Sequence, residues 1–450
     1  MIIARIKVLE WAHTFAGYAL SLIMLYLTNV WKLPTRHAAA IVNVYTGAKD
    51  ILPIGMVFLL DCFKNYYRML AISSLTYNIG LSLLAISTPP VLYKATHTCD
   101  EYKPECIGDT QQALFYTALV LIAFGLSGHT TAYQSFRKSI AEEGKSEVES
   151  CRRLLGRIAV LLISLTLAIG IGFIKPWSIL YGIVAIYSIM ATLLFLIGLW
   201  RYDRTRLQET EEEEQTQISA RMIPVWITFI MCGVVSSVGS TYFMDQANNM
   251  NRKVGRIKVP LILFPVFQER TKSFFSSWNS LILYNKSNEK FTGRNAWIGI
   301  VLGMVLSVLC CIIAAVVENK RLAVIRSHGL LDKPDDTIPL SVFILLPQFI
   351  LLGAVEGLAT TSIKYFFSNE DSDSTKYLNK FSNGVFGAGV VGNVLMVYVL
   401  SKVSESGGKP SWFQDTLNRS RLNNYYWALA ALSSVNLIAF LLVFCWYAST

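Results

Sequence analysis

Long apolar runs separated by short polar segments follow one another along the whole chain. Runs of about 20 apolar residues are long enough to form helices that cross a bilayer. The pattern predicts twelve spans, at residues 11–30, 40–61, 69–89, 112–133, 154–174, 178–200, 222–244, 258–284, 296–317, 337–363, 382–402 and 424–447. The chain is therefore expected to be an all-α membrane protein.

A polar segment divides these spans into two groups of six. It reads RYDRTRLQETEEEEQTQISAR, with its acidic run at 211–214, and is interpreted as a solvated linker; docking of a basic partner is the alternative. Two groups of six spans are typical of a major-facilitator transporter. The expected domains are an N-terminal six-helix bundle (1–200), a short cytoplasmic acidic linker (201–221) and a C-terminal six-helix bundle (222–450).

Composition and charge agree with a membrane protein. Hydrophobic residues make up 53% of the chain and charged residues 16%, whereas a soluble protein has about 25% charged residues. The net charge of +10 comes from Lys and Arg placed singly or in pairs between apolar runs, where they flank spans. The charge therefore indicates a lipid bilayer as partner and no nucleic acid. No cleavable signal peptide is expected after MIIARIKVLEWAH.

The distribution of Lys and Arg agrees with a cytoplasmic N-terminus only in the first half. There the cytoplasmic loops hold twelve basic residues and the outer loops six, but in the second half the split is six to twelve. The span 258–284 carries Glu269, Arg270 and Lys272 in its middle. If this span did not cross, the later loops would invert and the charge count would improve.

Glu356 is an acid in the second half of the span 337–363. A charge at membrane depth costs roughly 3 kcal/mol on insertion scales and usually faces a polar cavity. Its carboxylate could bind a proton or pair with a cation from another helix as the cavity changes exposure. The alternative is a protonated or salt-bridged glutamate that locks two helices together.

Other charged residues form a second set of candidates. Glu269 and Lys272 lie at i, i+3 and can neutralise one another on a helix, so a cavity-lining role and a structural ion pair are both open. Arg270 and Lys272 are the cations expected to meet an anionic solute. Asp61, after the second span, is read either as part of a gating loop or as a helix cap.

His13 and His129 lie near the first and fourth spans. Histidine titrates near neutral pH and could relay protons, although a hydrogen-bonded packing role is the alternative. Cys99 and Cys106 share one polar loop, which could hold a disulfide on a lumenal or extracellular face. Asn418 begins an N-R-S acceptor sequence that would be glycosylated if its loop faces a lumen.

Motifs of soluble enzymes are absent from the sequence. There is no Walker phosphate loop, dinucleotide glycine fingerprint or HExxH. The cysteines and histidines do not have metal-ligand spacing. We therefore expect neither an enzyme nor a cofactor or metal site.

Four stretches resemble the plant nitrate/peptide transporter family, the plant branch of the proton-coupled oligopeptide transporters. They are STYFMDQANNMNRKVG (240–255), VENKRLAVIRSHGLLD (317–332), LLPQFILLGAVEGLATTSIKYFF (345–367) and SWFQDTLNRSRLNNYYWALAALS (411–433). The resemblance implies a major-facilitator fold with twelve helices, cytoplasmic termini and alternating access, and it implies that the eighth span crosses. It also implies a gating or substrate-recognition role for Glu356.

The chain departs from this family where protons are handled. The family's E-x-x-E-R motif falls here on Leu9, Ala12 and His13, with Glu10 one place out of register, and its fourth-span lysine falls on Thr130. Losing these groups removes the usual proton relay, which puts proton coupling by that route in doubt.

The sequence thus predicts a secondary transporter of a small polar or anionic solute, such as nitrate, a short peptide or an amino-acid-like carboxylate. Its membrane is expected to be the plasma membrane or the vacuolar membrane. Transport would proceed by facilitated diffusion or by proton coupling rebuilt from Glu356, His13, Glu269 and Lys272. A receptor or scaffold with a transporter fold that moves nothing is the competing prediction, and the oligomeric state is left open.

Overall fold

The fold consists almost entirely of long helices. A computed structural model of the chain describes residues 2–63, 66–143, 163, 165–200, 223–283, 289–368, 375–406 and 408–449. Two compact units are formed, one from Met1–Lys32 with Leu52–Glu213 and the other from Leu33–Ile51 with Glu214–Thr450; we call them unit 1 and unit 2. The predicted linker at 201–221 lies outside the described residues and stays a prediction.

One helix contributes to both units. Helix α3 (Thr35–Phe63) is continuous across Pro53, and its first part belongs to unit 2. There Gly47 faces α14 (Thr375–Ser404), so closely that an added Cβ would lie 2.6 Å from the carbonyl oxygen of Gly387. The domain boundary predicted at residue 200 follows chain order and leaves residues 33–51 in the N-terminal domain. In the structure these residues pack with unit 2.

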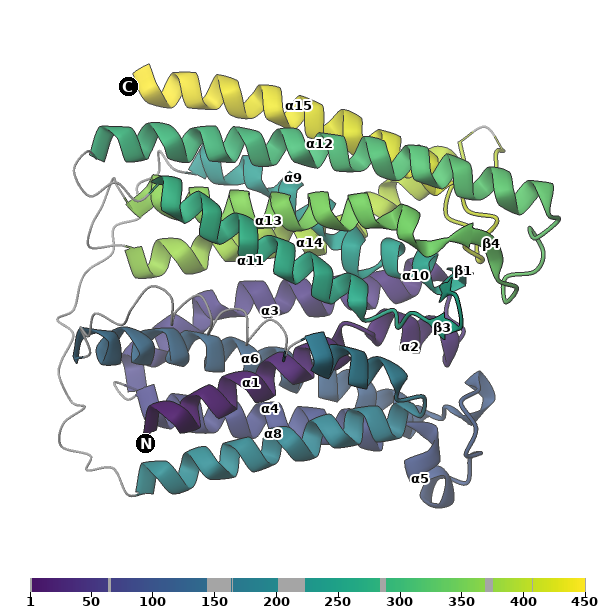
Figure 1. Ribbon diagram of the computed structural model, residues 1–450, viewed down its shortest axis with the longest axis horizontal. Helices are drawn as coiled ribbons and strands as arrows, with labels where there is room; N and C mark the ends of the chain where they lie inside the picture. Colours follow the sequence, from purple (N-terminus) through teal and green to yellow (C-terminus); the bar gives the residue numbers. More distant parts are fainter. Residues whose placement is uncertain are drawn as a thin grey trace. The chain divides into compact units, whose positions relative to one another are not determined.

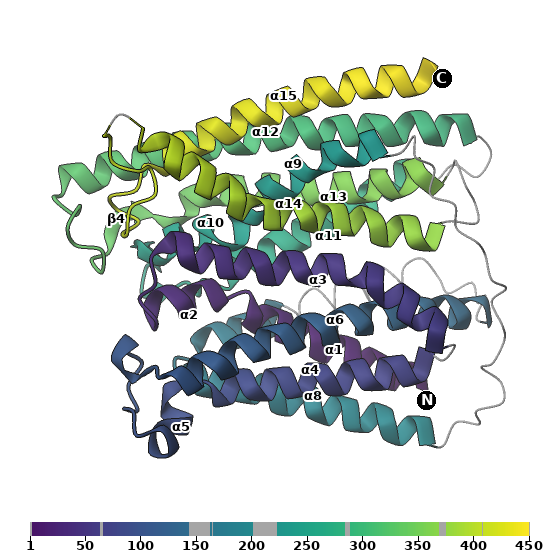
Figure 2. The ribbon, with the colours of Figure 1, turned by 180° about the vertical axis from the view of Figure 1, so that it is seen from behind.

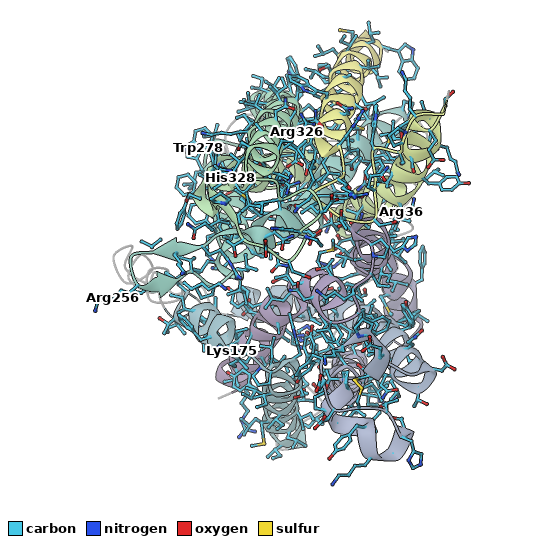
Figure 3. All side chains as sticks on the ribbon, turned by 90° about the vertical axis from the view of Figure 1, so that its right-hand side faces the viewer. Arg36, Lys175, Arg256, Trp278, Arg326 and His328 are labelled. Carbon is cyan, nitrogen blue, oxygen red and sulfur yellow. A yellow bond between two sulfur atoms is a disulfide. The ribbon has the colours of Figure 1, made fainter. Side chains whose placement is uncertain are left out.

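Unit 1 is built from helices that surround α4 and α6. Its elements are α1 (Ile2–Leu20), α2 (Ile23–Asn29), the second part of α3 (52–63), α4 (Tyr66–Ile86), α5 (Pro89–Thr96), η1 (Pro104–Cys106), α6 (Asp109–Glu143), a helical stretch at 165–173 and α8 (Trp177–Trp200). Helix α4 packs along α6, and α8 packs against both α1 and α4 (Figure 2). A disulfide joins Cys99 to Cys106 in the loop between α5 and α6, the pairing that the sequence allowed (Figure 3).

The described part of unit 2 has six long helices besides the first part of α3. Its elements are α9 (Ile223–Ser240), α10 (Tyr242–Asn249), β1 (Met250–Asn251), β2 (Lys253–Val254), β3 (Ile257–Lys258), α11 (Leu263–Leu283), α12 (Glu289–Ser327), β4 (Ile338–Ser341), η4 (Val342–Leu345), α13 (Leu346–Ser368), α14 and α15 (Leu422–Ser449). The helices α9, α11, α12, α13, α14 and α15 run in alternating directions (Figure 1). Strand β1 pairs with β4 in parallel, and β2 pairs with β3 as a hairpin.

The charged eighth span is a full helix that runs the length of unit 2. Helix α11 starts beside the β2–β3 hairpin and ends at the opposite end of the unit, with α13 along its side (Figure 1). A helix of 21 residues has the length that a crossing span needs, and the crossing itself stays a prediction. Arg256 and Arg326 both lie at the hairpin end of unit 2 (Figure 3).

Nine helices of the described part are long and apolar enough to cross a membrane. Two further helices are of similar length, α3 with 29 residues and α11 with 21. Helix α11 is less apolar than the nine because it carries charged residues in its middle. Large apolar side chains such as Ile186 on α8 and Leu442 on α15 are exposed. Such exposure is unfavourable in water and is expected of surfaces that face lipid.

Candidate functional site

The charged group that the sequence singled out lies where α13 meets α11. Gly353 and Gly357 stand on the α13 face that touches α11. A Cβ added at Gly353 would lie 2.5 Å from the carbonyl oxygen of Gln268, and one at Gly357 would lie 2.5 Å from that of Lys272. Small residues four apart allow two helix backbones to approach this closely. Their spacing therefore brings the Glu356 side chain within reach of α11.

Glu356 is 8% exposed and binds residues of two other helices. Its Oε1 accepts hydrogen bonds from the hydroxyl of Ser236 on α9 and from Nε2 of Gln268 on α11, the latter at 2.9 Å. Its Oε2 lies 3.2 Å from Nζ of Lys272. The two carboxylate oxygens thus have different partners. Neutral donors hold Oε1, and the cation holds Oε2.

Lys272 is the cation in this site. Its side chain is 36% exposed while its ammonium holds Glu356. Two further acids, Glu269 on the same helix and Asp50 on the first part of α3, lie within electrostatic range of it. Lys272 therefore stands among three carboxylates, of which Asp50 also pairs with Lys49 at 3.8 Å.

The structure separates the remaining charged candidates. Glu356 forms an ion pair with Lys272, and the role of this pair stays a proposal. Glu269 is exposed, and Arg270, half-buried, lies on another face of α11 from Lys272 by its place in the helix. Asp61 lies in α3, but its side chain is outside the described residues.

The histidine candidates lie together in unit 1. His13 on α1 and His129 on α6 stack with ring centroids 3.7 Å apart. Tyr77 stacks on the other face of His13 at 4.4 Å, and Tyr133 is parallel to His129 at 5.9 Å. Thr130, beside this column, donates its hydroxyl to the carbonyl oxygen of Ser127 in its own helix.

A third polar cluster is fully buried near the loop end of unit 2. Glu318 and Arg321 on α12 are both 0% exposed, and the Arg321 Nε and Nη2 donate to the two carboxylate oxygens of Glu318 at 2.7 and 2.8 Å. Arg321 also donates to Oδ1 of Asn418, which is 1% exposed and itself donates to the Leu330 carbonyl at 2.9 Å. A glycan on Nδ2 would displace the contact with Leu330, so the loop as folded does not accommodate the predicted glycosylation at Asn418.

Sequence reasoning missed Ser236, Gln268 and Asp50 as partners of the charged site. One signal was present for Gln268, because it lies four residues before Lys272 and so shares its helix face. The glycines on either side of Glu356 were a second signal, marking where a neighbouring helix approaches. Nothing local in the sequence points to Ser236 or Asp50, which come from other helices.

Comparison with solved structures identifies the fold as that of the major facilitator superfamily. The structure of an auto inhibited POT family peptide transporter is similar with a TM-score of 0.68 at 15% identity, covering 98% of this chain and 96% of that one. The POT family transporter PepTSo gives 0.68 at 14% identity, covering 100% and 98%. The nucleoside transporter NupG (D323A mutant) gives 0.63 at 14%, covering 99% and 100%. At these identities the likeness defines the fold alone.

Sequence relatives define the family. The profile of the POT family (PTR2) matches residues 202–413. Protein NRT1/ PTR FAMILY 5.5 of Arabidopsis thaliana is 30% identical over 97% of this chain and 95% of its own length. Protein NRT1/ PTR FAMILY 5.15 of the same plant is 26% identical over 96% and 90%. The chain belongs to the POT family, in its NRT1/PTR branch, and is a multi-pass membrane protein and secondary transporter.

Proposed function

We propose that this transporter carries a small polar or anionic solute and that Lys272 and Glu356 form its recognition and gating site. The observation that carries this proposal is the division of the Glu356 carboxylate. Ser236 and Gln268 hold Oε1, while Oε2 alone meets the ammonium of Lys272. The Lys272 contact can therefore be exchanged without releasing Glu356 from its other partners.

In this arrangement Glu356 occupies the position on Lys272 that the solute's own negative group would take. Nitrate and carboxylate oxygens make the same charge-assisted contact with an ammonium as Oε2 does. Because Lys272 is partly exposed, an anion can approach it and displace Oε2. The internal ion pair then forms when the solute leaves and breaks when the solute binds. The two states of the site therefore differ in their affinity for the solute, as alternating access requires.

The acids around Lys272 limit which anions are accepted. Glu269 and Asp50 stay in electrostatic range of Lys272 when its contact with Glu356 is exchanged. A polyanion would be repelled by them, whereas a singly charged anion or a zwitterion with an amino group would not. The relatives support this range: their names place them in the NRT1/PTR family, and one similar structure is a peptide transporter POT in complex with alafosfalin.

Flux through the purified full-length protein in proteoliposomes tests the proposal. The probes are labelled nitrate and dialanine, each with Lys272→Ala, Lys272→Arg and Glu356→Gln. We expect Lys272→Ala to lower the uptake of the accepted probe at least tenfold and Lys272→Arg to retain part of it. Lys402→Ala is the matched control, because Lys402 forms an exposed ion pair with Glu405 on α14 and should leave uptake unchanged.

Two outcomes would contradict the proposal. Unchanged uptake in Lys272→Ala and Glu356→Gln would remove the pair from recognition. Binding of a probe to the wild-type protein without any flux would favour the competing function, a receptor or scaffold that moves nothing.

A further inference from the structure

A short β-hairpin projects from the side of unit 2. Its strands β2 and β3 are joined by a turn at Gly255 and Arg256, in which Gly255 has a φ of +59°. Glycine adopts this backbone conformation without strain and is favoured at the first position of two-residue hairpin turns. A Cβ added at Gly255 would meet no atom of the described part within 4 Å, and Arg256 lies at the outer tip (Figure 3). The tip of the hairpin therefore does not pack on the helices of the unit.

The pairing of the two strands gives the hairpin two different faces. Val254 lies opposite Ile257, and Lys253 lies opposite Lys258. Residues directly opposite one another share a face, whereas successive residues along a strand point to opposite faces. Val254 and Ile257 are 53% and 63% exposed, and the two lysines are exposed as well. One exposed face of the hairpin is therefore apolar and the other is cationic.

The charge of this segment is positive throughout. Residues 246–268 include four basic side chains and no acid. Lys258 has a further interaction of its own, so the argument relies on Lys253 and Arg256. At the boundary of an anionic bilayer, apolar side chains reach the acyl chains while Lys and Arg are attracted to the phosphate groups. A hairpin with one apolar and one cationic face matches this boundary.

The position of the hairpin brings it to the level of the lipid headgroups. Only residues 259–262 separate β3 from the first residue of α11, and the headgroup layer beside the hydrocarbon core is about 5–8 Å thick. Helix α11 exposes large apolar side chains on one face, among them Phe274 and Trp278 at 65% and 45%. Trp278 and Arg256 lie on the same side of unit 2 (Figure 3). The hairpin therefore extends over the side that α11 presents to lipid.

We propose that this hairpin binds the headgroups of anionic phospholipids at the edge of unit 2. Val254 and Ile257 point into the boundary of the acyl chains, while Arg256 at the tip contacts phosphate oxygens through its forked donors. The flexible stem of Lys253 lets its ammonium reach the same level. An anionic surface attracts each nearby Lys or Arg with an energy that corresponds to about fivefold in affinity. This binding is independent of the solute and of the function proposed for Lys272 and Glu356.

Photolabelling of the full-length protein in lipid nanodiscs tests the proposal. The discs consist of phosphatidylcholine with a small fraction of a probe lipid, either phosphatidylglycerol or phosphatidylcholine, that carries a photoreactive group beside its headgroup. Mass spectrometry then identifies the labelled peptides. We expect phosphatidylglycerol to label residues 253–258 of the wild type, and to label them about tenfold less in the double variant Lys253→Gln/Arg256→Gln.

A second double variant is the matched control. Arg326→Gln/Lys333→Gln also removes two exposed cations, but from the end of α12 and the loop that follows it. We expect it to leave labelling of residues 253–258 unchanged. Thermal unfolding in detergent checks that both variants fold, which is expected because the replaced side chains are exposed.

The apolar face is tested with Val254→Ser/Ile257→Ser. We expect this variant to be labelled less by both probe lipids, because the hairpin then lies less deeply in the bilayer surface. Equal labelling of the wild type by the two lipids, or unchanged labelling in Lys253→Gln/Arg256→Gln, would overturn the binding of anionic headgroups. If neither probe lipid labels residues 253–258, the hairpin does not contact lipid and the proposal fails as a whole.

Discussion

The ammonium of Lys272 on α11 lies 3.2 Å from Oε2 of Glu356 on α13, while Oε1 is held by Ser236 and Gln268. The two partners differ in burial, since the lysine is 36% exposed and the glutamate 8%. Removing the Lys272 ammonium therefore leaves the Glu356 carboxylate buried without its cation. Removing the Glu356 carboxylate leaves a lysine whose side chain is partly exposed to solvent. Substitution of Lys272 and substitution of Glu356 should therefore affect the stability of the protein differently.

This asymmetry predicts the order of two variants. Lys272→Met should destabilise the protein by about 1–3 kcal/mol, because the carboxylate stays buried without its cation, and Glu356→Gln should cost less. The double variant should be more stable than Lys272→Met alone. Thermal unfolding of the purified protein in detergent measures all three, and additive effects of the two substitutions would show that the residues do not interact.

The glycines that flank Glu356 should be needed for the site to assemble. Gly357→Ala places a methyl group against the backbone of α11 at Lys272, which must push the two helices apart. We expect loss of both stability and solute binding. Gly392→Ala on α14 is the control, because an added Cβ there meets no atom within 4 Å. Equal behaviour of the two variants in thermal unfolding and uptake would contradict the close approach.

The buried pair of Glu318 and Arg321 should be more important for folding than any other charge described. Arg321→Met leaves the Glu318 carboxylate fully buried, with only Nε2 of Gln246 as a donor, at 2.6 Å. We expect a loss of about 3–5 kcal/mol, seen as low yield and a lowered melting temperature. Combining Arg321→Met with Glu318→Gln should recover part of it, and no recovery would mean that the carboxylate is not the source of the loss.

The disulfide offers a test of the orientation of unit 1. With a cytoplasmic N-terminus, the loop that holds Cys99 and Cys106 lies outside, so after reduction both thiols should react with an impermeant maleimide added to intact cells. Where the protein is expressed in the plasma membrane, reaction of the thiols only after the cells are opened would reverse the orientation. Because the closed loop is short, with a sequence separation of 7, reduction should cost about 2 kcal/mol.

Some features of this protein follow from local pattern and needed no structure. The apolar runs fix where helices form, and eleven of the twelve predicted spans coincide with helices of the described part, while most of the span at 154–174 lies outside it. The cost of a charge in an apolar run also singled out Glu356, which lies in an ion pair with Lys272. Hydrophobic periodicity and membrane depth are properties of a segment, so a sequence displays them directly.

The partners within the site are a different matter. Lys272 as the cation and Ser236, Gln268 and Asp50 as its surroundings depend on which helix faces approach, and α9, α11 and the first part of α3 are far apart in the chain. The stacking of His13 on His129 likewise joins helices separated by more than a hundred residues. The sequence determined that this is a helical membrane transporter with an acid in its tenth span. Only the tertiary structure decided which charges and rings meet, because long-range packing between helices is set by the shapes of all their faces together.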